Sequence, residues 1–147
     1  IPILSVFLVI QFLLPLRHLL YDSKLFWSEE GYRFSWRVML IEKTGYTIFT
    51  VEDLKSNKRI VVDNKIFLTP FQESKMSHTP DMILEYAHFL GDYYKSLGFI
   101  QPKVTVDSFS TLNGRVSTRF VKKDINLLEI KDSFKKYNWV LPFKDEI

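Results

Sequence analysis

The stretch TPDMILEYAHFLGDYYKSLG, residues 79–98, decides the fold class because it predicts one long amphipathic helix. Thr79 supplies a capping hydroxyl, Pro80 suits the first helical position, and Asp81 places a negative charge in the first turn. Gly98 follows where a left-handed residue ends a helix. Apolar side chains recur at helical spacing on one face, at Met82, Ile83, Tyr86, Ala87, Leu90, Tyr94 and Leu97.

The segment before this helix predicts antiparallel strands, because its side chains alternate. Residues 32–37 alternate aromatic and polar side chains, and residues 46–51 alternate again after a turn at Thr44-Gly45. We therefore expect a β-hairpin over about residues 32–54, followed by a short strand at residues 59–62.

The segment after the helix predicts a second hairpin. Residues 104–111 alternate, Asn113-Gly114 is the strongest short hairpin signal in the chain, and residues 115–121 should return antiparallel. Residues 124–139 are expected to hold a short helix, and the Trp-Val-Leu-Pro-Phe segment at residues 139–143 is expected to pack against the sheet. The predicted class is α+β, mostly β, with an antiparallel β-sandwich-like domain and one long amphipathic helix.

The first residues differ from the rest because they carry no charge before Arg17. Residues 1–16 read IPILSVFLVIQFLLPL, and with Leu19 and Leu20 they approach the ~20 apolar residues that span a bilayer. The segment lacks the initiating Met, the basic region and the cleavage site of a signal peptide, so we expect a fragment of a longer protein. We expect residues 1–20 to be the terminal part of a transmembrane helix and residues 21–147 to form the domain.

Composition and motifs exclude several classes of function. The absence of Cys removes disulfides, thiolate nucleophiles and Cys-ligated zinc. The net charge is +3, but Lys and Arg are interspersed with acids, so no nucleic-acid partner is expected. The three histidines lack metal-ligand spacing, so no metal is expected either. Gly-rich phosphate loops and GxSxG elbows are also absent.

Two histidines and two carboxylates are the residues most open to a chemical role. His18 follows Arg17 at the exit of the apolar segment, where an imidazole can polarise a membrane-dissolved quinone or handle a proton. An ordinary interfacial histidine is the alternative. His88 lies in the predicted helix and is interpreted as structural. Glu29 and Glu30 are adjacent, which favours capping or pairing with Arg over paired acid–base chemistry.

The aromatic face formed by Tyr32, Phe34 and Trp36 has two interpretations. The favoured one is the interior of the β-sandwich, and the other is a wall on which a ligand stacks. One surface can serve both purposes.

Several of these motifs together resemble a known family. LPLRHLLY at residues 14–21 precedes WSEEGYRFSWR at residues 27–37, and PDMIL with Ala87-His88, LNGR at residues 112–115 and WVLP at residues 139–142 follow. In order and spacing they resemble the vitamin K-dependent γ-glutamyl carboxylase-like (HTTM) family, in particular its bacterial branch. The resemblance covers essentially the whole chain, as a C-terminal part with the lumenal or exoplasmic domain.

The resemblance implies a bundle of membrane helices with a β-rich exoplasmic or periplasmic domain. Animal members oxygenate reduced vitamin K to an epoxide, and the strong base released removes a γ-proton from glutamate, after which carbon dioxide adds. The lysine that starts this reaction belongs to an upstream region. His18, Tyr32 and Trp36 match family positions linked to activity, whereas Trp27 and Arg33 look structural.

The implied cofactor is reduced vitamin K or a menaquinol-like quinol. The implied partners are a glutamate-containing peptide or protein, the upstream transmembrane helices of the same protein and the lipid bilayer. The Glu-Glu-Gly run at residues 29–31 follows the bacterial pattern, and epoxidation alone would suit the same architecture. Competing hypotheses are a non-catalytic peptide-binding or scaffold domain, and a soluble ligand-binding β-sandwich whose first helix belongs to the core.

Overall fold

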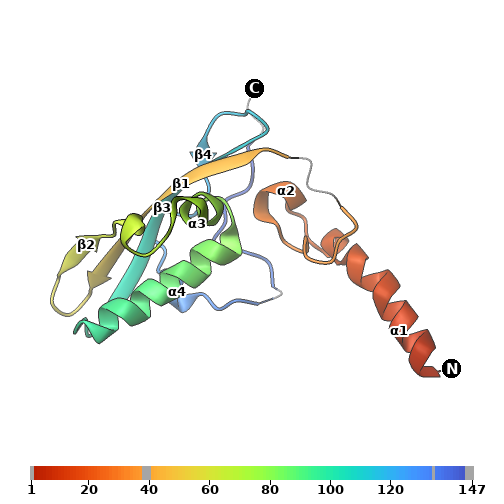
Figure 1. Cartoon of the computed structure of the whole chain (residues 1–147), viewed down its shortest axis with the longest axis horizontal. Coiled ribbons are helices and arrows are strands. Elements are labelled where there is room, and N and C mark those ends of the chain that lie inside the picture. Colours follow the sequence, from red (N-terminus) through yellow and green to blue (C-terminus); the bar gives the residue numbers. More distant parts are fainter. Residues whose placement is uncertain (1, 38–40, 134, 145–147) are drawn as a thin grey trace.

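The computed structural model describes residues 2–37, 41–133 and 135–144 (Figure 1). Its elements in chain order are α1 (Pro2–Leu13), η1 (Leu14–Leu20), α2 (Leu25–Ser28), β1 (Lys43–Asp53), β2 (Arg59–Val61), η2 (Asn64–Ile66), α3 (Pro70–Met76), α4 (Pro80–Ser96), β3 (Pro102–Leu112), β4 (Thr118–Arg119) and η3 (Leu127–Glu129).

The strands form one antiparallel sheet in the order β2-β1-β3-β4. Its centre is the pairing of β1 with β3 along their full length, from Lys43 opposite Leu112 to Asp53 opposite Pro102. Alternate residues of both strands are buried, as period-two patterning requires. Both α3 and α4 lie over one face of this sheet (Figure 1). The α+β class with an antiparallel sheet and a long helix is therefore confirmed.

A second sheet is not found among the described residues, so the sandwich part of the prediction is not confirmed. On one face of the sheet, α4 occupies the place that a second sheet would cover. On the other side Tyr46 and Ile48 remain about half exposed, and Tyr46 stacks on Phe109 with ring centroids 5.4 Å apart. The domain is thus one sheet with one helical layer, a common two-layer arrangement.

The long helix α4 forms where the sequence predicts it. Its buried residues are Pro80, Ile83, Leu84, Tyr86, Ala87, Leu90, Gly91 and Tyr94. Gly98 follows with φ +94°, a conformation that favours glycine. Two details differ from the prediction. The Thr79 side chain makes no capping hydrogen bond, and the predicted apolar stripe is exposed at both ends, at Met82 and Leu97.

The predicted hairpin over residues 32–54 is wrong in its first half. Residues 32–37 form successive turns, in which Tyr32 N–H donates to Glu29 O at 3.1 Å and Ser35 N–H donates to Tyr32 O at 3.0 Å. Phe34 has φ +67°, which breaks an extended strand. β1 instead pairs with β3, and it includes Thr44-Gly45, the predicted turn. Residues 38–40 lie outside the described residues.

The second predicted hairpin is confirmed in its turn. Asn113 and Gly114 have φ of +51° and +72°, which suit a tight hairpin turn. The returning strand β4 is only two residues long, and Val121 then forms an isolated bridge with Val140. The predicted packing of residues 139–143 against the sheet is confirmed by the burial of Trp139 and Val140 in the same hydrophobic core as sheet residues Phe49 and Val104. In residues 124–139, the described part holds a short helix, the three-residue 3-10 helix η3.

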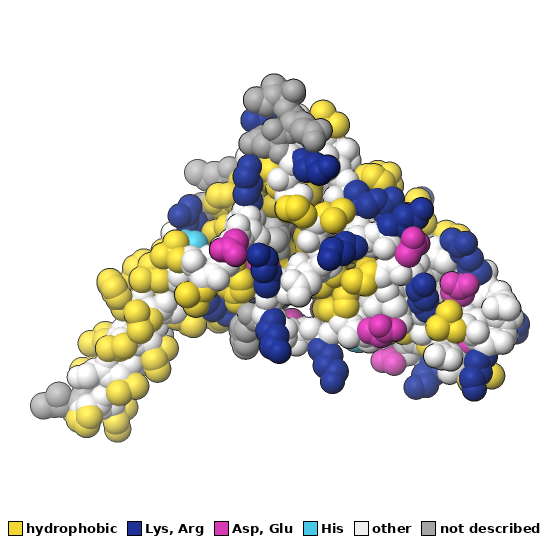
Figure 2. All heavy atoms as spheres, turned by 180° about the vertical axis from the view of Figure 1, so that it is seen from behind, with side chains coloured by type: hydrophobic (Ala, Val, Ile, Leu, Met, Phe, Trp, Pro, Cys, Tyr) yellow, Lys and Arg dark blue, Asp and Glu magenta, His cyan; other side chains and the backbone are white. Residues whose placement is uncertain are grey.

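The apolar helix α1 projects away from the sheet domain, and none of its residues is buried (Figure 1). Figure 2 shows hydrophobic side chains along its length, whereas lysine and arginine side chains spread over the domain. The stretch Pro2–Leu20 is long and apolar enough to cross a membrane, with mean hydropathy 2.0. Because α1 is exposed, it is not a core helix, and the soluble-sandwich hypothesis loses its main premise.

Candidate functional site at the base of the apolar helix

Trp27 anchors the segment after the apolar helix to the sheet domain. Its side chain is 1% exposed, and its Nε1–H donates to Leu141 O at 2.8 Å. The indole meets the Phe120 ring edge-on, with centroids 5.0 Å apart, and the Phe143 ring at 4.9 Å. The structural role that the family resemblance implies for Trp27 agrees with this geometry.

Glu29 and Lys43 add a charged tie at the same place. Lys43 Nζ lies 2.9 Å from Glu29 Oε1 and donates to Trp27 O at 2.6 Å. The ammonium also lies 4.6 Å from the centre of the Phe120 ring, a cation–π arrangement. Burial lowers the pKa of Lys43, and the Glu29 carboxylate opposes that shift.

Glu30 is buried and fully engaged as an acceptor. Its carboxylate accepts hydrogen bonds from the Ser23 hydroxyl, from the Ser28 hydroxyl at 3.0 Å and from Tyr137 N–H. Glu29 and Glu30 are therefore structural, as the sequence favours. Glu29 pairs with a lysine, and Glu30 accepts from two hydroxyls and a backbone amide.

Gly31 brings the following turn directly onto the backbone of η1. A Cβ at this position would lie 2.8 Å from His18 Cα and 3.0 Å from Tyr21 Cε2, and φ is +73°. Only glycine fits both the close approach and this conformation. His18 is half-buried there, and its Nδ1 lies 2.9 Å from Pro15 O.

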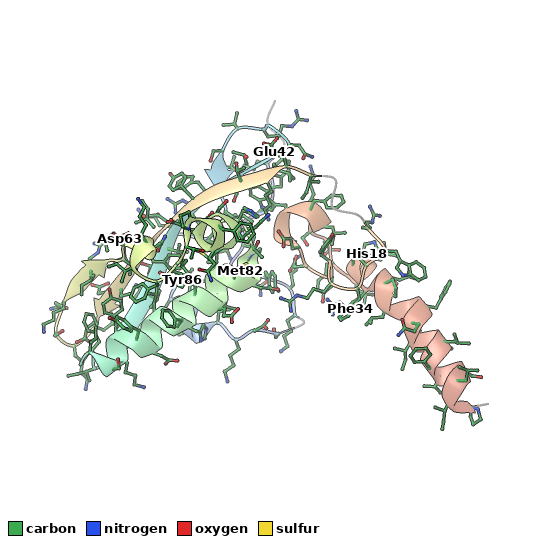
Figure 3. All side chains as sticks on the ribbon, in the orientation of Figure 1. His18, Phe34, Glu42, Asp63, Met82 and Tyr86 are labelled. Carbon is green, nitrogen blue, oxygen red and sulfur yellow. The ribbon has the colours of Figure 1, made fainter. Side chains whose placement is uncertain are left out.

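The structure brings the predicted site residues His18, Tyr32 and Trp36 to one region, the base of α1. Figure 3 shows His18 and Phe34 there. Trp36 is 71% exposed and meets the Phe12 ring of α1 edge-on, with centroids 6.1 Å apart. Tyr32 is half-buried. The predicted sandwich interior is corrected, because exposed aromatic residues do not line a core.

A polar cleft of about 300 Å³ lies beside this region, between η1, the turn after α2, α4 and residues 132, 133, 135 and 137. Arg33 Nη2 donates to Asp81 Oδ2 at 2.7 Å, and the Tyr137 hydroxyl donates to Asp81 Oδ1. Burial, and then the hydrogen bond to Asp81, raise the pKa of Tyr137. Sequence reasoning missed Asp81 and Tyr137 as site residues, because an acid in a first helical turn has an ordinary explanation.

The other histidines lie away from the base of α1. His88 Nε2 lies 2.8 Å from Ile130 O, which agrees with its predicted structural role. His78 is half-buried, and its pKa is lowered to about 4 by burial and by the charges of Lys43 and Lys75. Across the described ranges, no group of three or more metal-ligating side chains is found.

An apolar groove of about 310 Å³ lies between α4 and the η2–α3 segment. Met82 and Tyr86, labelled in Figure 3, belong to its α4 side. Its lining consists of Phe67, Leu68, Gln72, Met76, Met82, Glu85, Tyr86 and Phe89.

The fold and this junction define a class of protein, a sheet domain attached to the end of a membrane-type apolar helix. The chain belongs to the family of the vitamin K-dependent gamma-carboxylase lumenal domain, whose family model matches residues 1–146. Membership makes it a domain on the exoplasmic side of a membrane protein from a vitamin K-dependent family. No curated protein and no solved structure matches the chain significantly.

Proposed function

We propose that this chain is the membrane-proximal part of a membrane enzyme that couples quinol epoxidation to carboxylation of glutamate in a peptide or protein. The observation that carries the proposal is the family match over residues 1–146. In this proposal residues 1–20 are the terminal part of a transmembrane helix. Residues 21–147 form the exoplasmic domain, on the periplasmic side in a bacterial protein, and upstream helices of the same protein complete the site.

The residues at the base of α1 fit one side of a quinol site. Phe12, Phe34 and Trp36 expose aromatic surface beside a half-buried imidazole, which suits an aromatic, lipid-soluble head group. Reduced vitamin K or a menaquinol-like quinol, when bound, would supply on oxidation by dioxygen the strong base that removes a γ-proton from glutamate before carbon dioxide adds. Tyr32 and Trp36 would line the space in which this occurs.

His18 is the residue of this chain best placed to handle a proton. Because Pro15 O can only accept, the Nδ1 contact at 2.9 Å requires the proton on Nδ1. The neutral ring then offers Nε2 as an acceptor. His18 would take a proton from a quinol hydroxyl at Nε2 or polarise it, and the bond to Pro15 would hold the ring in that tautomer.

The test is His18→Ala in the full-length parent protein, with His88→Ala as the matched control. Both histidines are half-buried and bond a backbone carbonyl, but His88 lies on α4. Loss of a positioned acid–base group predicts a decrease in quinol-dependent turnover of about 10²- to 10⁴-fold for His18→Ala. Epoxide formation and incorporation of labelled carbon dioxide into a glutamate peptide are measured separately. Unchanged turnover in His18→Ala would exclude this role.

A second candidate function is a non-catalytic peptide-binding or scaffold domain. The apolar groove beside α4 favours it, since Phe89 is 47% exposed and Glu85 lies in the lining. Two results together would favour this candidate over the enzyme. The chain would bind a peptide and lose that binding in Phe89→Glu, and the parent protein would form neither epoxide nor carboxyglutamate.

A further inference from the structure

The segment at residues 32–37 carries two of the three candidate site residues but has little packing of its own. It forms turns instead of a strand, and Phe34 and Trp36 are 70% and 71% exposed. Within the described residues, its side-chain tie to α4 is the 2.7 Å ion pair between Arg33 and Asp81. Among the described residues, the Arg33–Asp81 pair and the ring contact of Trp36 with Phe12 therefore hold the direction in which the segment presents its aromatic side chains.

Asp81 is a rigid point of attachment. It lies in the first turn of α4, a 17-residue helix with one face buried against the sheet. Both carboxylate oxygens are engaged, Oδ2 by Arg33 and Oδ1 by the Tyr137 hydroxyl. A carboxylate held through both oxygens has a fixed orientation, and it fixes the guanidinium that it binds.

Tyr137 joins the same attachment to the start of the segment. Its hydroxyl binds Asp81, and its backbone N–H binds the Glu30 carboxylate, one residue before Gly31. The segment is thus held on both sides, by Glu30 through the backbone of Tyr137 and by Arg33 through Asp81.

We propose that Asp81, supported by Tyr137, is a positioning residue that holds Arg33 and thereby orients Tyr32 and Trp36 at the base of α1. Only the kinetic consequence of this inference rests on the proposed function. The contacts described for Asp81 are with Arg33 and Tyr137, and it acts through Arg33.

The kinetic test is Asp81→Asn in the full-length protein, with Asp107→Asn as the matched control. Asp107 forms a comparable pair with Arg119, at 2.8 Å, on the sheet. Misplacement of a site segment by about 1 Å predicts a loss of kcat of about 10- to 100-fold for Asp81→Asn. The KM for a glutamate peptide should stay unchanged, Asp81→Glu should recover part of kcat, and Asp107→Asn should match the parent.

The double variant shows whether the two residues act as one unit. Arg33 is 71% exposed, so Arg33→Gln should fold normally and lower kcat as Asp81→Asn does. The combination Arg33→Gln/Asp81→Asn should be no slower than either single variant, because the same pair is lost each time. Additive losses would overturn the inference.

A structural test needs no turnover and uses the 147-residue chain in detergent micelles. Trp27 and Trp139 are 1% and 3% exposed, so the acrylamide-accessible tryptophan emission comes from Trp36. The anisotropy of this emission should fall in Asp81→Asn and Arg33→Gln and stay unchanged in Asp107→Asn. Unchanged anisotropy in all three variants would refute positioning by Asp81. If the anisotropy falls in Asp81→Asn and Arg33→Gln but the parent protein shows no turnover, the positioning role is retained and the proposed function is rejected.

Discussion

Glu29 and Lys43 form an ion pair, with Oε1 and Nζ 2.9 Å apart, that joins the segment after the apolar helix to the first strand of the sheet. The Lys43 side chain is 3% exposed and that of Glu29 is 17% exposed, so water screens the pair poorly. The pair lies directly beside the Trp27 anchor, whose carbonyl also accepts from Lys43.

Removal of this lysine should destabilise the domain. Lys43→Met leaves the Glu29 carboxylate poorly solvated without its cation, and the expected loss in free energy of unfolding is about 3 kcal/mol. Lys43→Met/Glu29→Gln removes both charges and should lose less than the single variant. Urea unfolding followed by tryptophan fluorescence measures both. Equal losses would show that the two charges are not coupled.

Gly31 and Gly98 should respond differently to alanine, although both have positive φ. A Cβ at Gly98 meets nothing within 4 Å, so Gly98→Ala should cost only the backbone strain, about 1 kcal/mol. Gly31→Ala adds a clash with the His18 backbone, and overpacking contributes about 1–3 kcal/mol more. Thermal unfolding of the two variants gives the comparison, and a similar loss in both would contradict the close approach at His18.

Asp53 should give the domain a specific sensitivity to acid. The Ser56 hydroxyl, at 2.6 Å, and Gln101 N–H, at 2.8 Å, lower the pKa of this carboxyl to about 2 from its usual 3.8. A depressed pKa stabilises the folded state at pH above 3.8, and this stabilisation is lost as the pH falls towards 2.

Asp53→Asn should therefore be less stable than the parent near neutral pH, and the difference should shrink as the pH falls from 3.8 to about 2. Urea unfolding at a series of pH values measures this change. A constant difference across the series would mean that ionisation of Asp53 does not contribute.

Local sequence patterns were enough to predict the elements that bury one face. The period of α4, the turn at Asn113-Gly114 and the alternation of residues 104–111 all appear in the structure, because each depends on nearby residues only. Residues 32–37 show the opposite case. They alternate like a strand, but Gly31 and Phe34 adopt positive φ, and the partner of β1 comes much later in the chain.

The residues of the candidate site stay predictions, and the sequence did not indicate their supports. The family resemblance names His18, Tyr32 and Trp36, the position of His18 after the apolar segment points to the same residue, and the structure gathers the three at the base of α1. Asp81 and Tyr137 gave no signal, because 56 residues separate these partners and a hydrogen bond over that span leaves no local pattern.

The Trp27 anchor also sets an order of events during synthesis. Its partner Leu141 lies 114 residues later, and at about 5–20 residues per second a ribosome needs roughly 6–23 s to reach it. The apolar helix can enter a membrane during that interval, whereas Trp27 must wait for its acceptor. If residues 1–20 span a membrane as proposed, insertion of the helix therefore precedes closure of the junction, and a nascent chain that stops before Leu141 lacks the Trp27 anchor.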